Sequence, residues 1–188
     1  HREGGGAEVL EKATSFLQAQ LLGTMGELSD PALGQYVETA LKSKDARLRA
    51  AAQKRAWAAG LSGMEVFAKA LETGSLEEKR SALSNLALSD DPKADALLAA
   101  QFTKLDPRLE LDLLEAADEA KGTEARKKAK ARQNELVSAG ALGLFLPTLR
   151  GGDVEAGKKV ALGHPSAQCI RCHKVGASGG VLGPDLSK

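Results

Sequence analysis

Two cysteines and a histidine form the most chemically informative pattern in the sequence, Cys169-Ile170-Arg171-Cys172-His173. Two thiols separated by two residues can form thioether bonds to the two vinyl groups of one haem, and the adjacent imidazole can then bind its iron. The pattern therefore predicts one covalently bound haem c per chain. Cys169 and Cys172 are the expected attachment residues, and His173 is the expected axial ligand of the metal.

Other interpretations of the same residues remain open. Cys169 and Cys172 can act as a redox dithiol, although such pairs usually follow a strand of a βαβ unit, and no strand pattern precedes this one. They can also supply half of a zinc site with His164 and His173. No second cysteine pair is present, however, and adjacent Cys172 and His173 are awkward ligands for one tetrahedral ion. A spacing that arose by chance is the remaining alternative, and we favour haem.

The segment that carries these residues has little core of its own. Gly151-Gly152 forms a linker, and Asp153 is expected to cap a short helix that ends near Leu162. From Gly163 onwards the chain is rich in glycine and proline and shows no helical apolar periodicity. Such a stretch needs something besides its own side chains to organise it, so we expect residues 151–188 to form a separate haem-binding domain.

Residues 1–150 have the composition of packed helices, because alanine and leucine dominate and β-branched residues are scarce. We expect an all-α fold with essentially no sheet. Helix starts are marked by Asp30-Pro31, Asp91-Pro92 and Asp106-Pro107 and by the capping boxes Ser62…Glu65 and Ser75…Glu78. Left-handed glycines that end helices are expected at Gly60, Gly74, Gly122 and Gly140.

The helix starts also repeat along the chain. Starts near residues 30, 62, 91 and 123 alternate with starts near 43, 75 and 106, so a two-helix unit recurs about every 31 residues. Each unit of such an array buries its apolar face against the next unit. The spacing therefore predicts an α-solenoid over residues 1–150.

The haem motif and its flanks resemble a known family. Residues 152–159, the motif itself and Gly183-Pro184-Asp185-Leu186 are similar to the first part of a class I cytochrome c. Residues 164–176 with Gly179-Gly180 resemble the haem-binding domain of large planctomycete and verrucomicrobial proteins, and residues 73–79 and 109–117 resemble the HEAT-like repeats that precede it. The resemblance covers roughly residues 70–188. It implies a HEAT-like α-solenoid of two-helix repeats followed by a partial class I cytochrome c-like haem segment.

The resemblance also implies roles for individual residues. The carbonyl oxygen of Pro184 would accept a hydrogen bond from Nδ1–H of His173, which orients the ring and raises its basicity. Gly157 would let the first helix of the domain cross another helix closely. The apolar side chains expected to line the haem are Val160, Leu162, Val175, Leu182 and Leu186.

Two features depart from the family pattern. Ala161 stands where the family usually has an aromatic residue, and the sequence ends 15 residues after His173, before the distal ligand and final helix of a complete domain. Met25 and Met64 lie in the helical part, and His164 is expected to cap the turn that follows it. We therefore expect the haem in this chain to have no intrinsic sixth ligand, so its ferrous form would bind carbon monoxide.

These expectations describe an electron carrier and not an enzyme. Its electrons would come from a redox partner or from a dehydrogenase domain, which in the family often lies upstream as a β-propeller. Thioether attachment takes place outside the cytoplasm, so we expect an exported, periplasmic protein. The sequence contains no apolar run of membrane-spanning length. The alternative is a protein-interaction module in which the α-solenoid is the functional part and the haem segment is incidental.

One stretch of positive charge raises a further possibility. Residues 121–132 contain six lysines and arginines and a single glutamate, and a helical solenoid with a basic face can bind DNA. The net charge of the whole chain is only +1, and most charged helix surfaces are simply solvated. We interpret the stretch as a solvated helix face and do not expect nucleic acid binding.

Overall fold

The computed structural model describes residues 14–61, 63–104 and 106–187. These residues are mostly helical, which confirms the all-α class in its general form. The strands among them are β1 (Lys174–Val175) and β2 (Ser178–Gly179), a minimal antiparallel hairpin, which agrees with the expectation of essentially no sheet. The chain divides into two compact units, His1–Pro147 and Thr148–Lys188, three residues before the expected boundary.

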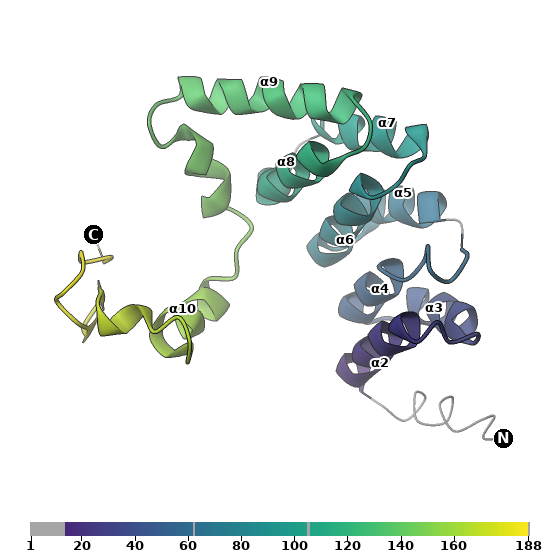
Figure 1. Cartoon of the computed structure of the whole chain (residues 1–188), viewed down its shortest axis with the longest axis horizontal. Helices are drawn as coiled ribbons and strands as arrows, with labels where there is room; N and C mark the ends of the chain where they lie inside the picture. Colours follow the sequence, from purple (N-terminus) through teal and green to yellow (C-terminus); the bar gives the residue numbers. More distant parts are fainter. Residues whose placement is uncertain (1–13, 62, 105, 188) are drawn as a thin grey trace. The chain divides into compact units, whose positions relative to one another are not determined.

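The α-helices of the first unit form two rows (Figure 1). One row consists of α2 (Ser15–Glu27), α4 (Ala46–Gln53), α6 (Leu76–Ala87) and α8 (Glu110–Glu119). The other row consists of α3 (Leu33–Leu41), α5 (Gly63–Thr73), α7 (Pro92–Gln101) and α9 (Glu124–Ser138). Within the first row α2 packs on α4, α4 on α6 and α6 on α8, while α3, α5 and α9 pack on α4, α6 and α8 respectively. Short 3₁₀ segments, η1 (Pro107–Leu109) and η2 (Gly143–Leu149), precede α8 and follow α9.

Helices of the second row begin at regular intervals. The first residues of α3, α5, α7 and α9 are 33, 63, 92 and 124, so successive starts are 30, 29 and 32 residues apart. Each start lies within three residues of its predicted position. The predicted spacing of helix pairs is therefore present in the structure.

Alanine and leucine fill the interior of the first unit. A larger cluster of buried side chains extends from Ala56 to Leu136, and a smaller one contains Leu22, Val37 and Ala52. Phe67 is the largest of the fully buried side chains and has no solvent exposure. Small alanines allow neighbouring helices to approach closely, so short helices can bury a continuous apolar layer.

Several predicted helix starts are confirmed. Asp91 caps α7 by accepting a hydrogen bond from the backbone N–H of Lys93 at 2.9 Å. Ser75 and Glu78 form the predicted capping box at the start of α6, in which each side chain accepts from the other residue's backbone N–H. Asp106 caps η1, which leads into α8.

One predicted helix start differs from the structure, and another lies outside the described residues. The carboxylate of Asp30 accepts from the N–H of Ala32 at 2.8 Å, but α3 begins only at Leu33. Pro31 therefore occupies a turn before the helix instead of its first position. Ser62 lies outside the described residues.

The predicted glycine stops serve two different purposes. Gly60 and Gly140 adopt the expected left-handed conformation, with φ of 70° and 120°. Gly74 and Gly122 have no positive φ, so this part of the prediction is wrong. A Cβ on Gly74 would lie 2.5 Å from a carbonyl oxygen of α5, and one on Gly122 would collide with the side chain of Asp95. That side chain caps α9 by accepting hydrogen bonds from two of its backbone N–H groups, so glycine is needed for close approach.

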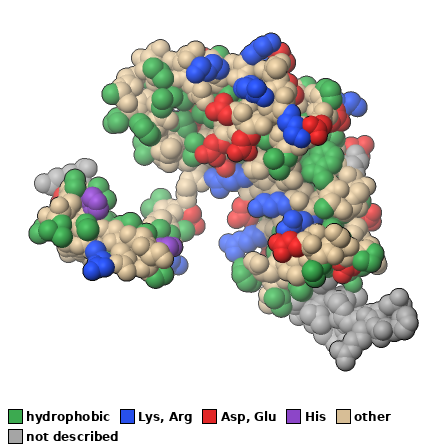
Figure 2. All heavy atoms as spheres, viewed as in Figure 1, with side chains coloured by type: hydrophobic (Ala, Val, Ile, Leu, Met, Phe, Trp, Pro, Cys, Tyr) green, Lys and Arg blue, Asp and Glu red, His purple; other side chains and the backbone are tan. Residues whose placement is uncertain are grey.

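Ion pairs join successive helices of the first row. Arg49 donates from Nε and Nη2 to the two carboxylate oxygens of Glu78, at 2.7 and 2.8 Å, and so joins α4 to α6. Arg80 lies 3.2 Å from the carboxylate of Asp112 and joins α6 to α8. Arg49 and Arg80 are 31 residues apart, so the same type of arginine–carboxylate pair occurs in two consecutive helix interfaces. Figure 2 shows side chains of both signs interspersed over this unit.

The buried ion pair makes stability depend on pH. The hydrogen bonds from Arg49 lower the pKa of Glu78 from 4.5 to about 2. Because the folded-state pKa is the lower one, the pair stabilises the fold fully above about pH 4.5, and this stabilisation is lost as the pH falls towards 2. We expect the free energy of unfolding to decrease by about 2–3 kcal/mol over this range through Glu78 alone, as measured by urea denaturation followed by circular dichroism.

Two substitutions separate this contribution from the others. Glu78→Gln should flatten the pH dependence, whereas Glu77→Gln should leave it unchanged, because the side chain of Glu77 is 49% exposed and lies 3.8 Å from Arg47. A residual slope is expected from Asp106, because hydrogen bonds from Arg108 lower its pKa to about 2 as well. An unaltered slope in Glu78→Gln would contradict the prediction.

The second unit is built from short elements. Helix α10 (Val154–Gly163) begins after Asp153, whose carboxylate accepts from the N–H of Ala156 at 2.9 Å, so the predicted cap and extent are confirmed. The 3₁₀ segment η3 (Cys169–Arg171) and the β1–β2 hairpin follow, with Gly176 at φ 63° in the turn. None of the described residues from 148 onwards is buried. Among the described helices of the whole chain, none is long and apolar enough to span a membrane.

Candidate haem-attachment site

The two thiols lie on one short turn. Cys169 begins η3, and its carbonyl oxygen accepts hydrogen bonds from the backbone N–H groups of Cys172 and His173, at 3.4 and 3.0 Å. Gln168, immediately before the turn, adopts a left-handed conformation with φ of 46°. Both cysteines are free; Cys169 is half-buried and Cys172 is exposed. The turn therefore holds two thiols and an imidazole within five consecutive residues.

The ring of His173 is fixed by the segment that follows the hairpin. Its Nδ1 lies 2.9 Å from the carbonyl oxygen of Pro184, which is the hydrogen bond that the family resemblance implies. A carbonyl oxygen can only accept, so Nδ1 is the donor in this contact and Nε2 is the ring nitrogen that takes no part in it. The N–H of Gly183 also donates to the carbonyl oxygen of Cys172 at 2.7 Å. The hydrogen bond through Nδ1 thus fixes the orientation of the ring and leaves Nε2 as the nitrogen that could bind a metal.

Gly183 packs directly against the imidazole, a contact that the sequence reasoning did not identify. A Cβ at this position would lie 2.7 Å from Cε1 and 2.8 Å from Nδ1 of His173. Gly180 is similarly close to the backbone of Arg171. The signal that was available is the Gly183-Pro184 pair, in which the glycine permits the approach and the proline supplies the acceptor.

Gly183→Ala should release the histidine ring. The methyl group cannot fit at its present distance, so the ring or the Gly183-Pro184 segment must move and the hydrogen bond to Pro184 weakens. The loss of one hydrogen bond, worth about 1 kcal/mol, should shift the tautomer ratio of His173 about fivefold away from the Nδ1–H form. Long-range ¹H–¹⁵N NMR spectra of the haem-free chain measure this ratio directly.

Gly157→Ala is the matched control, because no atom lies within 4 Å of a Cβ placed there. This substitution should leave the tautomer ratio of His173 unchanged while stabilising α10 by up to about 1 kcal/mol. Equal tautomer ratios in the Gly183→Ala and Gly157→Ala variants would show that Gly183 does not control the ring.

Backbone hydrogen bonds hold the rest of the loop. The N–H of Gly180 donates to the carbonyl oxygen of Ile170 at 2.8 Å, and the N–H of Leu186 donates to the carbonyl oxygen of Lys174 at 2.9 Å. The N–H of Gly176 donates to the hydroxyl oxygen of Ser187 at 2.6 Å. Hydrogen bonds from Ser187 also lower the pKa of Asp185. The attachment turn, the hairpin and the Gly-Pro-Asp-Leu segment consequently form one hydrogen-bonded loop.

His164 occupies a separate position with a structural role. Its Nδ1 accepts hydrogen bonds from the backbone N–H groups of Ser166 and Ala167, at 3.3 and 3.1 Å. The expectation that His164 caps its own turn is therefore confirmed. Across the described ranges, no group of three or more histidine, cysteine, aspartate or glutamate side chains is arranged to hold a metal ion. The zinc interpretation, which needed His164 beside the thiols, gains no support from this arrangement.

The apolar side chains expected to line a haem are largely in contact with solvent. Val160, Leu182 and Leu186 are exposed, Leu182 to 87%, whereas Leu162 and Val175 are half-buried. These apolar side chains are not buried by the rest of the second unit. Together with the free thiols and the oriented imidazole, they would suit a large apolar ligand whose binding buries them. No atom of the described residues lies within 4 Å of a Cβ placed on Gly157, so the helix crossing that the resemblance implies there stays a prediction.

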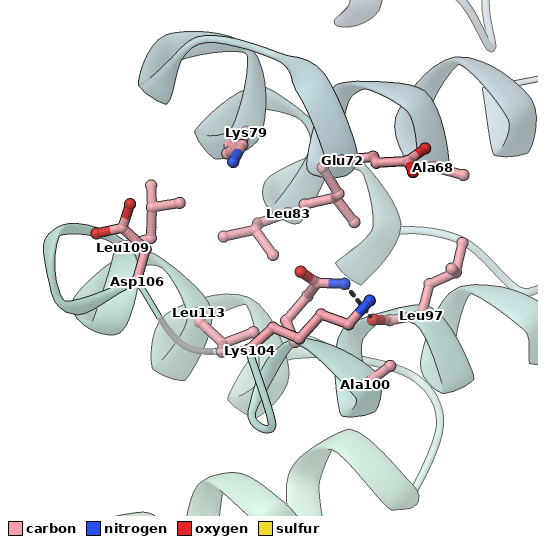
Figure 3. A pocket seen from close by; sticks show the side chains of 12 residues that line it. Ala68, Glu72, Lys79, Leu83, Leu97, Ala100, Lys104, Asp106, Leu109 and Leu113 are labelled. Carbon is pink, nitrogen blue, oxygen red and sulfur yellow. Dashed lines mark hydrogen bonds between the residues drawn. The ribbon is translucent and has the colours of Figure 1, made fainter.

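The first unit offers concave surfaces of a different kind. A cavity of about 430 Å³ lies between α5, α6, α7 and α8, with leucines such as Leu83 and Leu113 inside and the charged residues Glu72, Lys79 and Lys104 around it (Figure 3). Its charges balance, because Asp106 also lines it. We see no chemistry that this cavity would perform.

The basic stretch lies on α9 and just before it. Lys127 pairs with Glu124, Arg132 pairs with Glu110 and Glu135, and Lys121 pairs with Asp90. Much of the positive charge is therefore compensated locally, as expected of a solvated helix face.

No protein-family model matches this chain, and no curated protein or solved structure matches it either. The resemblance described from the sequence therefore remains a proposal, and the geometry of the loop is its support.

Proposed function

We propose that this protein binds one haem c covalently and transfers electrons through it. The observation that carries the proposal is the hydrogen bond between Nδ1 of His173 and the carbonyl oxygen of Pro184, formed next to two free thiols on one turn. A redox dithiol does not require an adjacent histidine with a fixed tautomer. A haem attachment site does, because the imidazole must present an unprotonated nitrogen to the metal.

Each residue of the loop has a defined task in this proposal. The sulfur atoms of Cys169 and Cys172 would hold the haem through thioether bonds to its vinyl groups, and Nε2 of His173 would be the protein ligand of its iron. Pro184 holds the imidazole ring in its orientation, and apolar side chains such as Leu182 and Leu186 exclude water from one face. When bound, haem c supplies one-electron redox chemistry. No residue of this chain has to act as a general acid or base, so we propose a carrier and not an enzyme.

The first unit is, in this proposal, a HEAT-like α-solenoid that spaces or presents the haem segment. The regular helix starts and the ion pairs repeated between α4, α6 and α8 support this description. A dehydrogenase domain or a separate redox protein would donate electrons. We propose that the protein is exported to the periplasm, since thioether attachment takes place outside the cytoplasm.

Co-expression of the chain with the cytochrome c maturation machinery tests the proposal. A pyridine haemochrome spectrum should report one covalently bound haem per chain, and mass spectrometry of the denatured protein should show the corresponding mass increase. Protein that remains free of covalent haem under these conditions would exclude this function.

A protein-interaction module is the second candidate, and the charged groove described below favours it independently. Removal of residues 151–188 distinguishes the two functions. Redox activity would be lost in either case, but binding of a protein partner would persist only if the first unit is an interaction module.

A further inference from the structure

A groove of about 510 Å³ lies between α2, α4 and α6 in the first unit. Its walls carry Arg47, Lys54 and Arg80, with Arg55 just beyond the end of α4. Figure 2 shows Lys and Arg side chains gathered over α4 and α6. This surface is separate from the haem-attachment loop, and nothing in the proposed electron transfer uses it.

The charges of the groove are strongly unequal. Among the described residues, four cationic side chains and one acidic side chain, that of Glu77, line it. Glu77 compensates little of this charge, because its carboxylate lies 3.8 Å from Arg47 and both side chains are largely exposed. Arg80 is held by Asp112, whereas Lys54 makes no ion pair with any of the described residues. The groove therefore carries a net positive charge in a chain whose overall charge is only +1.

Arg55 is positioned by α2 and not by an acidic partner. A Cβ on Gly26 would lie 3.0 Å from Cδ and 3.2 Å from Nε of Arg55, and one on Gly23 would lie 3.4 Å from Nη2. The guanidinium side chain thus lies across a glycine surface of α2. Because the side chain already packs on α2, binding of an anion would cost less side-chain entropy than it would for an arginine extended into solvent.

The lining favours a polypeptide ligand. The residues between the cationic side chains are mostly small: Ala19, Gly23, Ala50, Ala51, Ser81 and Ser84. Small side chains let a backbone approach closely, and arginine pairs bidentately with carboxylates. No aromatic side chain is among the described residues that line the groove, so these residues offer no stacking platform for nucleic acid bases. We propose that this groove binds a segment of a partner protein rich in aspartate and glutamate.

A labelled peptide of about eight residues that alternates glutamate with alanine tests this proposal on the full chain, with or without haem. An extended peptide of this pattern places its carboxylates on one face. Fluorescence anisotropy at low ionic strength should show saturable binding that weakens as salt is added. The double variant Arg47→Gln/Lys54→Gln should bind the peptide about five- to twentyfold more weakly, and Arg55→Gln should weaken binding as well.

The matched control is Lys128→Gln/Lys130→Gln on α9, which removes the same charge from exposed positions outside the groove. It should change the affinity less than about twofold. Circular dichroism checks that each variant keeps its helices. Equal weakening in the two double variants would overturn the proposal, because binding would then follow net charge alone. A labelled oligothymidylate that binds the groove more tightly than the peptide would overturn it in favour of nucleic acid.

Discussion

Replacement of both Cys169 and Cys172 by serine is expected to abolish the proposed covalent attachment of haem completely. The serine hydroxyl is close to the thiol in size, so the 3₁₀ turn and its hydrogen bonds to the carbonyl oxygen of residue 169 should form as before. Serine cannot form a thioether bond, and covalent haem should fall from one per chain to none. Pyridine haemochrome spectra and haem staining after denaturing electrophoresis measure the difference. Each single variant should retain at most one bond.

His164→Asn provides the control for this experiment. The asparagine side-chain oxygen can accept the hydrogen bonds that Nδ1 of His164 receives from Ser166 and Ala167, so the entry to the loop should be preserved. We expect this variant to keep one haem per chain. Loss of haem from His164→Asn alone, with normal helicity, would instead assign His164 a direct part in the site.

Phe67→Ala is expected to cause the largest loss of stability of any single substitution discussed. Phe67 lies on α5 within the larger core cluster and has no solvent exposure, and its ring centroid lies 5.5 Å from that of Trp57 with the two rings tilted by 56°. Removal of a fully buried phenyl ring leaves a cavity and should cost about 3–5 kcal/mol. Since small domains are stable by only about 5–15 kcal/mol, much of the protein could unfold at room temperature. Urea denaturation followed by circular dichroism measures the loss.

Phe16→Ala is the matched control at the other extreme of burial. Its side chain is 73% exposed on α2, so the same change should alter the free energy of unfolding by about 0.5 kcal/mol or less. A loss at Phe67 no larger than that at Phe16 would show that the larger core cluster does not form as described.

Much of the local structure follows from the sequence. The Ser75–Glu78 capping box and the Asp91-Pro92 start use side-chain chemistry that acts within three residues, so they can be predicted without a tertiary fold. The hydrogen bond from His173 to Pro184 spans 11 residues, and it was expected only because the segment resembles a cytochrome.

Features that depend on distant contacts were not predictable. The sequence predicts Gly122 to be a helix stop. In the structure, glycine is needed there because a larger side chain would collide with Asp95 of α7, which caps α9. Gly183 is expected from the sequence only to be part of a loop, whereas in the structure its lack of a side chain leaves room for the imidazole of His173. The positive groove between α2, α4 and α6 likewise combines residues that are scattered in the sequence. Residue types and their spacing indicate local geometry, whereas contacts between residues that are distant in the sequence are seen only in the folded structure.

The packing of each helix mainly on helices close to it in the sequence also determines the order in which the molecule loses its structure. Contacts between α2 and α4, α4 and α6, and α6 and α8 connect residues only one helix pair apart, so partial opening need not disrupt the whole array. The cluster around Leu22 and Val37 is the smaller one, whereas Phe67 and Leu98 belong to the larger. Amide hydrogens of α2 and α3 should therefore exchange with deuterium sooner than those of α6 and α8.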